Sequence, residues 1–183
     1  MTPHNPASPI QPWKELSRTQ VFKKYSRSID EVTFELPGGS IEKYYIKNEG
    51  HTCATLGLTD AGEVILARQF RPGPKAILLE IPGGFIGEDE RQLETAQREF
   101  TEETGYTGEL EYVGSCIDDA YSTVRRHCFV ARHCQKVSEP EQTATEHTEV
   151  VLLSVKEFRA LLRSGELTDV EVGYRCLDYL GLL

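Results

Sequence analysis

Three glutamates, Glu99, Glu102 and Glu103, lie within the short stretch REFTEETG, Arg98–Gly105. On a helix, at about 100° per residue, they form one contiguous stripe. Like charges at i,i+3 and i,i+4 repel each other, and carboxylates near a helix carboxyl end also oppose its dipole. A hard divalent cation resolves this conflict, because Mg²⁺ takes oxygen ligands and is commonly held by a couple of carboxylates together with substrate phosphates. The stretch predicts such a cation site; the alternative is a solvated acidic face relieved by an Arg98–Glu102 pair at i,i+4.

A helix that positions these carboxylates is predicted over Glu88–Thr104. Leu93, Ala96 and Phe100 recur at helical spacing, and Leu93 and Ala96 fall within about 40° of Phe100 on the helix surface. Acidic residues are enriched at the start, and Gly105 stands where a left-handed residue would end the helix. We therefore expect the apolar side chains to face the core and the glutamate stripe to run beside that buried face.

Apolar runs on both sides of this helix predict β-strands. Two strands are expected to form a hairpin around the LPGG turn within 21–50, and two more to flank a turn at 60–62. Because strands precede and follow one central helix and further helices come last, the fold class is α+β or a mixed-sheet sandwich. The remaining predicted elements are strands at 76–84, 110–117, 125–134 and 150–155 and helices at 154–166 and 170–183.

The composition excludes several function classes. A formal net charge of −9 argues against a sequence-independent grip on nucleic acid and against an anionic membrane surface as partner. No run approaches the ~18 apolar residues that a membrane-spanning helix needs. The five cysteines, an odd number without a C-x-x-C pair, are expected to be reduced thiols of a cytoplasmic protein. The proline-rich start favours a flexible tail over 1–20.

The residues before the helix make the glutamate stripe more specific. Gly84, then five residues, Glu90, seven residues and Arg98–Tyr106 together match every fixed position of the Nudix box, G-x5-E-x7-R-E-U-x-E-E-x-G-U, where U is bulky and apolar. Chance occurrence of all these identities is on the order of 10⁻⁶ or less at background frequencies. The chain therefore resembles the Nudix hydrolases. The resemblance implies that Arg98 and Glu90 mainly brace the loop and helix.

The resemblance covers approximately 21–183 and is narrower than the box alone. The segments LPGGSIEKYYI, VILARQFRPG, LLEIPGGFIGEDE and LLRSGELTDVEVG are similar to the ADP-ribose pyrophosphatase-like branch. That branch implies an α/β/α Nudix sandwich with a mixed sheet, and a homodimer formed through an amino-terminal antiparallel hairpin or sheet that lends aromatic residues such as Trp13, Phe22 or Tyr25. The expected organisation is a flexible tail at 1–20, the hairpin and dimerisation element at 21–50 and the Nudix hydrolase domain at 51–183.

The resemblance also implies a metal site. In such enzymes Mg²⁺ or Mn²⁺ is held by the first and last glutamates of the R-E-U-x-E-E segment, here Glu99 and Glu103. Glu102 assists, and the backbone carbonyl next to the box glycine contributes, here that of Gly83. Cations bridging phosphoryl oxygens offset developing charge and lower the pKa of a bound water, which suits cleavage of a pyrophosphate.

A general base is expected from outside the helix, in the loop before the last strand. Glu146 is favoured because EHTEVVLLSV resembles the family's approach to that strand. Glu141 is the second choice, and the alternative for either residue is that it only solvates the loop. The predicted catalytic set is accordingly Glu102 and Glu146 together with the bracing residues Arg98 and Glu90.

Substrate-binding residues are expected just before the box. Arg68 and Arg71 end one strand, and the period-2 alternation places them on opposite faces, so that only one should face the ligand. Guanidinium groups suit bidentate contacts with phosphate, and Arg71 is the better candidate. Glu80 lies inside an apolar strand, where an unpaired carboxylate would be costly, so it should either pair with an arginine or face the ligand.

The predicted function is Mg²⁺-dependent hydrolysis of a nucleoside diphosphate derivative, with ADP-ribose, cleaved to AMP and ribose 5-phosphate, ahead of other nucleotide sugars and dinucleotides. One departure keeps these alternatives open. ADP-ribose-specific members usually carry a proline downstream of the box, and the stretch Cys116–Cys134 contains none. A different class is a Nudix-fold module that senses such metabolites without cleaving them, although the retention of all box glutamates favours an enzyme.

Overall fold

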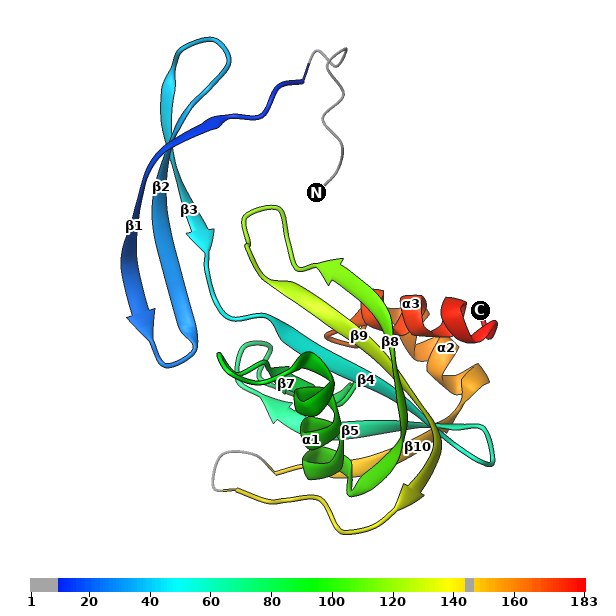
Figure 1. The fold of residues 1–183 in the computed structure, drawn as a ribbon. Coiled ribbons are helices and arrows are strands. Elements are labelled where there is room, and N and C mark those ends of the chain that lie inside the picture. The colour runs from blue at the N-terminus through cyan, green and yellow to red at the C-terminus, as the bar shows by residue number, and fades with distance from the viewer. Residues whose placement is uncertain (1–9, 144–146) are drawn as a thin grey trace. The chain divides into compact units, whose positions relative to one another are not determined.

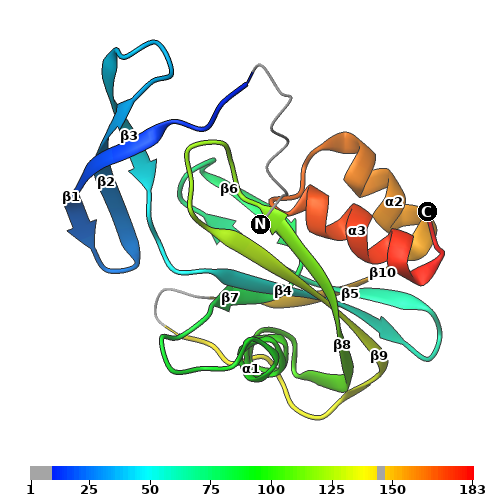
Figure 2. The same ribbon diagram turned by 45° about the horizontal axis from the view of Figure 1, so that its top comes forward.

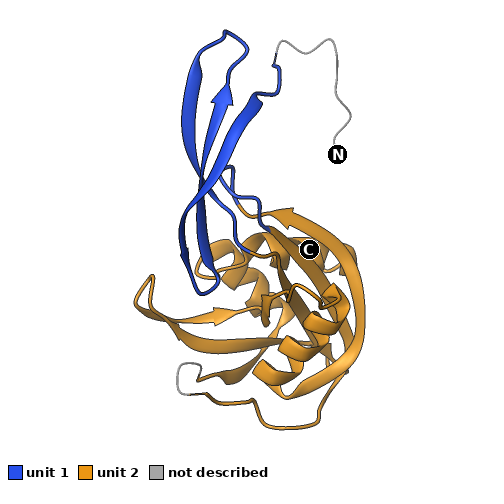
Figure 3. Cartoon of the chain, turned by 60° about the vertical axis from the view of Figure 1, so that its left-hand side comes forward, with its two compact units in different colours: residues 1–49, 119–124 blue, residues 50–118, 125–183 orange. Residues whose placement is uncertain are grey.

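The computed structural model describes residues 10–143 and 147–183 (Figure 1). The chain divides into two compact units (Figure 3). Unit 1 comprises 1–49 together with the short segment 119–124, and unit 2 comprises 50–118 and 125–183. The carboxylates of the Nudix box all belong to unit 2.

Unit 1 is a three-stranded antiparallel sheet in the order β1-β2-β3. The predicted hairpin is confirmed as β2 (Arg27–Glu35) and β3 (Ile41–Lys47), which pair from Ile29↔Lys47 to Glu35↔Ile41. The sequence did not predict β1 (Lys14–Lys24), which pairs with β2 and overlaps the tail expected at 1–20. Its sequence, KELSRTQVFKK, lacks the apolar alternation from which a strand is predicted, and all of its residues are exposed.

The segment 119–124 joins unit 1 through backbone hydrogen bonds to the end of β3. Lys47 donates its N–H to the Tyr121 carbonyl at 2.8 Å, and Thr123 donates to the Lys47 carbonyl at 2.9 Å. The Tyr121 ring stacks on Tyr44 with centroids 6.1 Å apart. This segment lies within Cys116–Cys134, the stretch in which the expected proline is missing.

Unit 2 is built on a seven-stranded sheet whose main path is β10-β5-β4-β9-β8, with β6 paired to β5 and β7 paired to β4. The β4–β9 pair is parallel and the other pairs are antiparallel, which makes the sheet mixed. The strands are β4 (Thr52–Thr59), β5 (Glu63–Arg71), β6 (Ala76–Glu80), β7 (Gly83–Phe85), β8 (Tyr106–Ile117), β9 (Arg125–Lys136) and β10 (Glu149–Ser154).

Helices cover both faces of this sheet, as Figure 2 shows. Helix α1 (Gln92–Thr104) lies on one face, and α2 (Val155–Ser164) and α3 (Val170–Leu180) lie on the other. Phe100 and Ala96 are fully buried between α1 and the sheet, whereas Leu93 is 43% exposed, so the expectation that Leu93 faces the core is wrong. The α/β/α sandwich is therefore confirmed, with a narrower buried stripe on α1 than the sequence predicted.

Local sequence signals explain where the helices begin and end. The segment Glu88–Arg91 precedes α1 as a loop, so the helix starts later than predicted, and Gly105 ends it in the left-handed conformation with φ 70°. Ser154 and Glu157 form a reciprocal capping box at the start of α2. Among the described residues, no helix has both the length and the apolar character needed to cross a membrane.

Candidate active site

Two box glutamates lie against the double glycine, Gly83–Gly84, that starts β7. A Cβ on Gly84 would stand 2.5 Å from the Glu99 carboxyl carbon, and one on Gly83 would stand 2.1 Å from the Cys53 carbonyl oxygen. Glu103 accepts a hydrogen bond from the Gly83 N–H at 2.9 Å. Only glycine allows β7 to pass this close to β4 and to the helix, and this brings both carboxylates to one place on the backbone.

Arg98 is the centre of the exposed part of the site. Its guanidinium donates to both oxygens of Glu90, from Nε at 2.9 Å and from Nη2 at 3.1 Å. Nη1 also lies 2.9 Å from Glu99 and 3.0 Å from Glu102. The hydrogen bond from Arg98 lowers the pKa of Glu90 to about 2. Three carboxylates thus share one guanidinium, which ties the box loop to the helix and leaves the group net negative.

Glu103 is the carboxylate that most lacks a compensating positive charge. Burial raises the pKa of Glu103 to about 8, and the negative charges of Glu99 and Glu80 act in the same direction. The Gly83 N–H and the Arg71 guanidinium oppose this increase without cancelling it. A divalent cation beside Glu99 and Glu103 would supply the missing charge.

The donor set fits a magnesium-type ion. All predicted ligand atoms are oxygens: the carboxylates of Glu99, Glu102 and Glu103 and the Gly83 carbonyl. Within the described part of the chain, no three acidic, histidine or cysteine side chains converge into a preformed metal cage. Mg²⁺ does not require such a cage, because it keeps several waters and is commonly completed by substrate phosphates.

Arg71 of β5 and Glu80 of β6 form a second charged group, on the seven-stranded sheet. Arg71 donates from Nε to both oxygens of Glu80 at 2.8 Å and from Nη2 to Oε2 at 2.5 Å. Gln69 donates to the same carboxylate at 3.0 Å. Hydrogen bonding to Glu80, together with the charge of Glu103, raises the pKa of Arg71 against the effect of its burial. Of the two expectations for Glu80, the structure realises the pairing with an arginine.

Arg68 makes a different contact. It lies one strand position before Gln69, so its side chain takes the opposite face of β5, and its guanidinium is 2.7 Å from Glu149 on β10. Both side chains of this pair are about half exposed or more. Arg71, rather than Arg68, therefore belongs to the group of charges around Glu103.

The predicted general bases receive different structural support. Glu146 lies outside the described residues. Glu141 donates its backbone N–H to the Glu102 carbonyl at 2.7 Å, which fixes its segment to the carboxyl end of α1. Gln142 and Thr148 then exchange two hydrogen bonds, of 2.9 and 3.1 Å. The segment that carries Glu141 is thus anchored at the helix end that bears Glu102 and Glu103.

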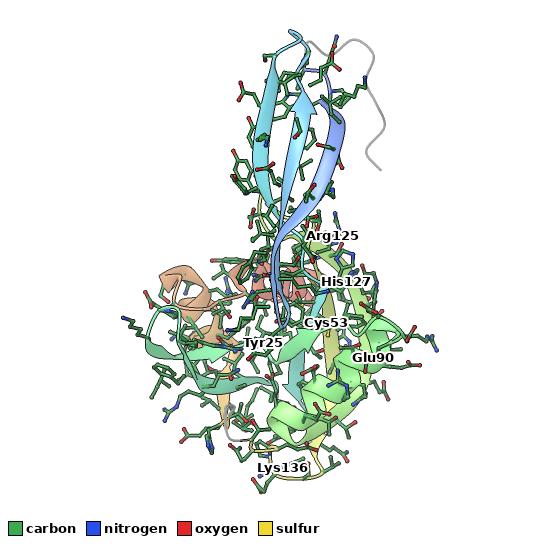
Figure 4. All side chains as sticks on the ribbon, turned by 90° about the vertical axis from the view of Figure 1, so that its left-hand side faces the viewer. Tyr25, Cys53, Glu90, Arg125, His127 and Lys136 are labelled. Atoms are coloured by element: carbon green, nitrogen blue, oxygen red, sulfur yellow. The ribbon has the colours of Figure 1, made fainter. Side chains whose placement is uncertain are left out.

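The sequence did not single out a polar cluster at the other end of α1. His127 of β9 lies beside Cys53 of β4 (Figure 4). Its ring nitrogens approach Gln92 at 3.4 Å and the Tyr112 hydroxyl at 3.3 Å. Burial lowers the pKa of His127, so the neutral imidazole is favoured. The partners of His127 come from separate elements, so no local spacing in the sequence could have identified this cluster.

A further missed group surrounds Arg126 at the start of β9. Arg126 forms ion pairs with Asp169 and with Asp118, the latter at 2.9 Å, and with Glu171 at 3.1 Å. Asp118 is therefore occupied in an ion pair, and Asp119 accepts the Tyr121 N–H in a tight turn at 2.6 Å. These contacts tie the beginning of α3 to β9.

Comparison with known proteins agrees with this geometry. The NUDIX domain model matches residues 51–174, more than half of the chain. The chain is 28% identical to an ADP-ribose pyrophosphatase of Bacillus subtilis (strain 168) over 92% of both chains. It is 28% identical to a methanol dehydrogenase activator of Bacillus methanolicus over 67% of this chain and 68% of that one. It is also 42% identical to an ADP-sugar pyrophosphatase of Mus musculus over 35% of this chain and 30% of that one.

The fold has a solved counterpart as well. A crystal structure of an ADP compounds hydrolase superposes with a TM-score of 0.76, covering 97% of this chain and all of that chain at 18% identity. The sequence match, the complete box and the α/β/α architecture agree with one another. The chain belongs to the NUDIX family.

Proposed function

We propose that the protein hydrolyses the pyrophosphate bond of ADP-ribose, giving AMP and ribose 5-phosphate, with Mg²⁺ or Mn²⁺ as cofactor. The observation that carries the proposal is the placement of a cation-seeking carboxylate pair, Glu99 and Glu103, against Gly83 and Gly84, with Arg71 acting on the charge of Glu103. A metal-bound pyrophosphate needs negative groups for the metal and a positive group for its phosphates, and this part of unit 2 offers both.

The carboxylates of Glu99 and Glu103 and the carbonyl of Gly83 would hold the cation, with Glu102 assisting from the next helical position. When bound, the cation would supply charge compensation for the phosphoryl oxygens and a more acidic water. Arg98 and Glu90 keep the box loop fixed to α1 through their two hydrogen bonds. Arg71 would contact a phosphate or ribose oxygen of the substrate, because guanidinium donors match such oxygens.

Hydrolysis adds one water across the bond: its oxygen bonds to one phosphorus, the bridging P–O bond breaks, and the proton goes to a base. We assign that base to Glu146, with Glu141 as the alternative. The backbone contact between Glu141 and Glu102 supports a loop position near the end of α1. Removing each carboxylate separately, as Glu146→Gln and Glu141→Gln, distinguishes the two assignments by which variant loses kcat.

The named relatives support the substrate class. Two of them are an ADP-ribose pyrophosphatase and an ADP-sugar pyrophosphatase, and the first aligns over 92% of both chains. Because no proline lies between Cys116 and Cys134, other ADP-sugars are the second candidate substrates. The segment 119–124 of this stretch belongs to unit 1.

The same proposal extends to assembly and compartment. We place the protein in the cytoplasm as a homodimer formed through the unit 1 sheet. The exposed aromatic and apolar side chains on this sheet support such a contact, and they include Trp13, Val21, Phe22, Tyr25 and Tyr45. Sedimentation equilibrium with Val21→Glu, compared with wild type, tests this assembly: the variant should be monomeric.

The function is tested by incubating the protein with Mg²⁺ or Mn²⁺ and ADP-ribose, ADP-glucose, GDP-mannose, NADH, diadenosine polyphosphates or 8-oxo-dGTP and separating the products. ADP-ribose should be converted fastest, to AMP and ribose 5-phosphate. Faster conversion of another compound would overturn the substrate. A folded protein that binds ADP-ribose but cleaves no compound with either metal would overturn the enzymatic function and favour a sensor.

A further inference from the structure

The carboxylate of Glu80 is buried and is hydrogen-bonded by protein side chains, so it is not available to a ligand. The residue is only 3% exposed. Arg71 donates to both of its oxygens, and Gln69 donates to Oε2 as well. A buried carboxylate is tolerated only when it is paired and hydrogen-bonded, and here the protein itself supplies both conditions. Glu80 therefore acts on its neighbours rather than on the substrate.

The register of the β5–β6 hairpin shows what this pairing does to Arg71. Arg71 lies opposite Ala76, whereas Glu80 lies opposite Ala67. The two positions are four residues apart along the strands, about 13 Å. Their side chains meet because that of Arg71 extends back along the strand toward Glu80. Without this contact, the Arg71 side chain would be free to extend toward the 72–75 turn.

The direction of this displacement is toward the box. Strand β6 runs from Ala76 to Glu80 and leads directly into the double glycine that starts β7. A guanidinium held at Glu80 is thus held near the double-glycine end of the hairpin, and the charges of Arg71 and Glu103 act on each other there. The side chain of Arg71 remains 40% exposed, so part of its donor surface is open to solvent.

The donors used by Glu80 determine which edge of the guanidinium stays open. The Glu80 contacts use Nε and Nη2 of Arg71. Within 10–143 and 147–183, no protein group accepts a hydrogen bond from Nη1. An arginine oriented in this way presents one edge to an anion while its other edge is fixed.

Gln69 completes the arrangement from the same face of β5. It is 6% exposed, and alternation along the strand places it on the side of Arg71 and away from Arg68. Its amide donates to Glu80 Oε2, the oxygen that also accepts from Arg71 Nη2. The carboxylate is thus held at two points, and it cannot rotate without breaking one of them.

We propose that Glu80 and Gln69 are positioning residues, which hold the Arg71 guanidinium at the box end of the β5–β6 hairpin so that its Nη1 edge binds a phosphate oxygen of the substrate. This inference rests on the proposed function for the identity of the anion. It replaces the sequence-based assignment of Glu80 as a substrate contact, and it gives Gln69 a role that its residue type does not reveal.

The kinetic test is a double-mutant cycle with ADP-ribose and Mg²⁺, using Arg71→Ala, Glu80→Gln and the combination. Glu80→Gln should raise KM about tenfold, as expected for the loss of one charge-assisted contact, with a smaller change in kcat. In the Arg71→Ala background it should change KM less than twofold, since the group it positions is gone. Equal effects of Glu80→Gln in both backgrounds, or an unchanged KM in the single variant, would overturn the proposal.

Two controls keep this result interpretable. Arg163→Ala removes an exposed arginine of α2 and should leave KM unchanged. Gln69→Leu is the milder variant should Glu80→Gln fail to fold, and it should raise KM two- to threefold. A variant with a lower Tm but an unchanged KM would show a purely structural role and contradict the proposal.

A second readout separates this inference from the proposed function. In ¹⁵N NMR spectra, the Arg71 Nε–H signal, assigned by its loss in Arg71→Ala, should exchange slowly with water in wild type and rapidly in Glu80→Gln. Rapid exchange in wild type would sink the positioning role whatever the substrate is. Slow exchange in a protein that does not cleave ADP-ribose would preserve the positioning of Arg71 and overturn the proposed substrate.

Discussion

Two groups of unit 2 both pair arginine with glutamate, but they differ in the number of carboxylates per guanidinium. Around Arg98, one guanidinium faces three carboxylates, those of Glu90, Glu99 and Glu102, and the group is partly exposed. Around Arg71, one guanidinium faces one buried carboxylate, Glu80, with a neutral amide as third member. The first group has an excess of acceptors and the second has an unused donor edge.

The difference indicates what each group is suited to bind. Excess carboxylate oxygen next to a poorly compensated Glu103 favours a hard cation, whereas an arginine with one fixed edge favours an oxyanion. A pyrophosphate that carries its own divalent cation would satisfy both groups at once. Counting salt bridges would miss this distinction, because both groups contain short ion pairs.

The largest loss of activity should come from Glu103, the box carboxylate that does not pair with Arg98. Glu103→Gln should lower kcat/KM for ADP-ribose at least about 100-fold, because it removes a predicted metal ligand without changing shape. The matched control is Glu94→Gln, an exposed glutamate in the first turn of the same helix, which should retain activity. Equal activity of the two variants would mean that α1 holds no cation at Glu103.

The next largest effect should come from Arg71, and it should change substrate binding rather than the requirement for Mg²⁺. Arg71→Ala should raise KM for ADP-ribose by about 10- to 100-fold, the range expected for a lost hydrogen bond to a charged group. Its Mg²⁺ requirement should stay close to that of wild type, since Arg71 bears no metal ligand atom. Steady-state kinetics over a matrix of substrate and Mg²⁺ concentrations measures both quantities, and a shift in the Mg²⁺ requirement alone would break the comparison.

A smaller effect is expected from Glu90, through stability. The folded pKa of Glu90 is lowered to about 2 by Arg98, below the usual carboxyl value of 4.5. Its contribution to stability is therefore present above pH 4.5 and is lost as the pH falls from 4.5 toward 2. Glu90→Gln should have a lower Tm than wild type near pH 7, and the two Tm values should converge across that acid window. A constant difference down to pH 2 would show that the charge of Glu90 is not responsible.

The smallest effect should come from Arg68, the other arginine at the end of β5. Its exposed pair with Glu149 is of the surface type that contributes little to stability. Arg68→Ala should change KM less than about twofold and Tm only slightly. A KM increase comparable with that of Arg71→Ala would mean that both faces of the strand reach the substrate.

Sequence reasoning was most successful where a local pattern carried the information. The apolar period of α1, its end at Gly105, the LPGG hairpin and the capping box at Ser154 are all decided by neighbours a few residues apart. The box spacing singled out Glu99, Glu102 and Glu103 as candidate ligands, because the motif of the family fixes their positions. The alternation along β5 also separated Arg71 from Arg68 before any contact was known.

What the sequence missed depends on distant partners. Strand β1 is exposed along its length and its few apolar residues do not alternate, so its pairing with β2 is what reveals it as a strand. Leu93 follows the helical period but is 43% exposed, and period alone cannot reveal which apolar positions the sheet covers. Gln69 gains its role from a carboxylate eleven positions away on the next strand. The ion pairs of Arg126 likewise join three separate segments.

The most direct test of the central claim compares Glu99→Gln and Arg71→Ala with wild type in ADP-ribose hydrolysis, with Mg²⁺ and substrate varied independently. The account predicts that Glu99→Gln raises the Mg²⁺ concentration needed for half-maximal rate and lowers kcat, while Arg71→Ala raises KM for ADP-ribose at an unchanged Mg²⁺ requirement. Identical kinetic defects in the two variants, or a wild-type rate that does not depend on a divalent cation, would contradict the division into a cation-binding and an anion-binding group.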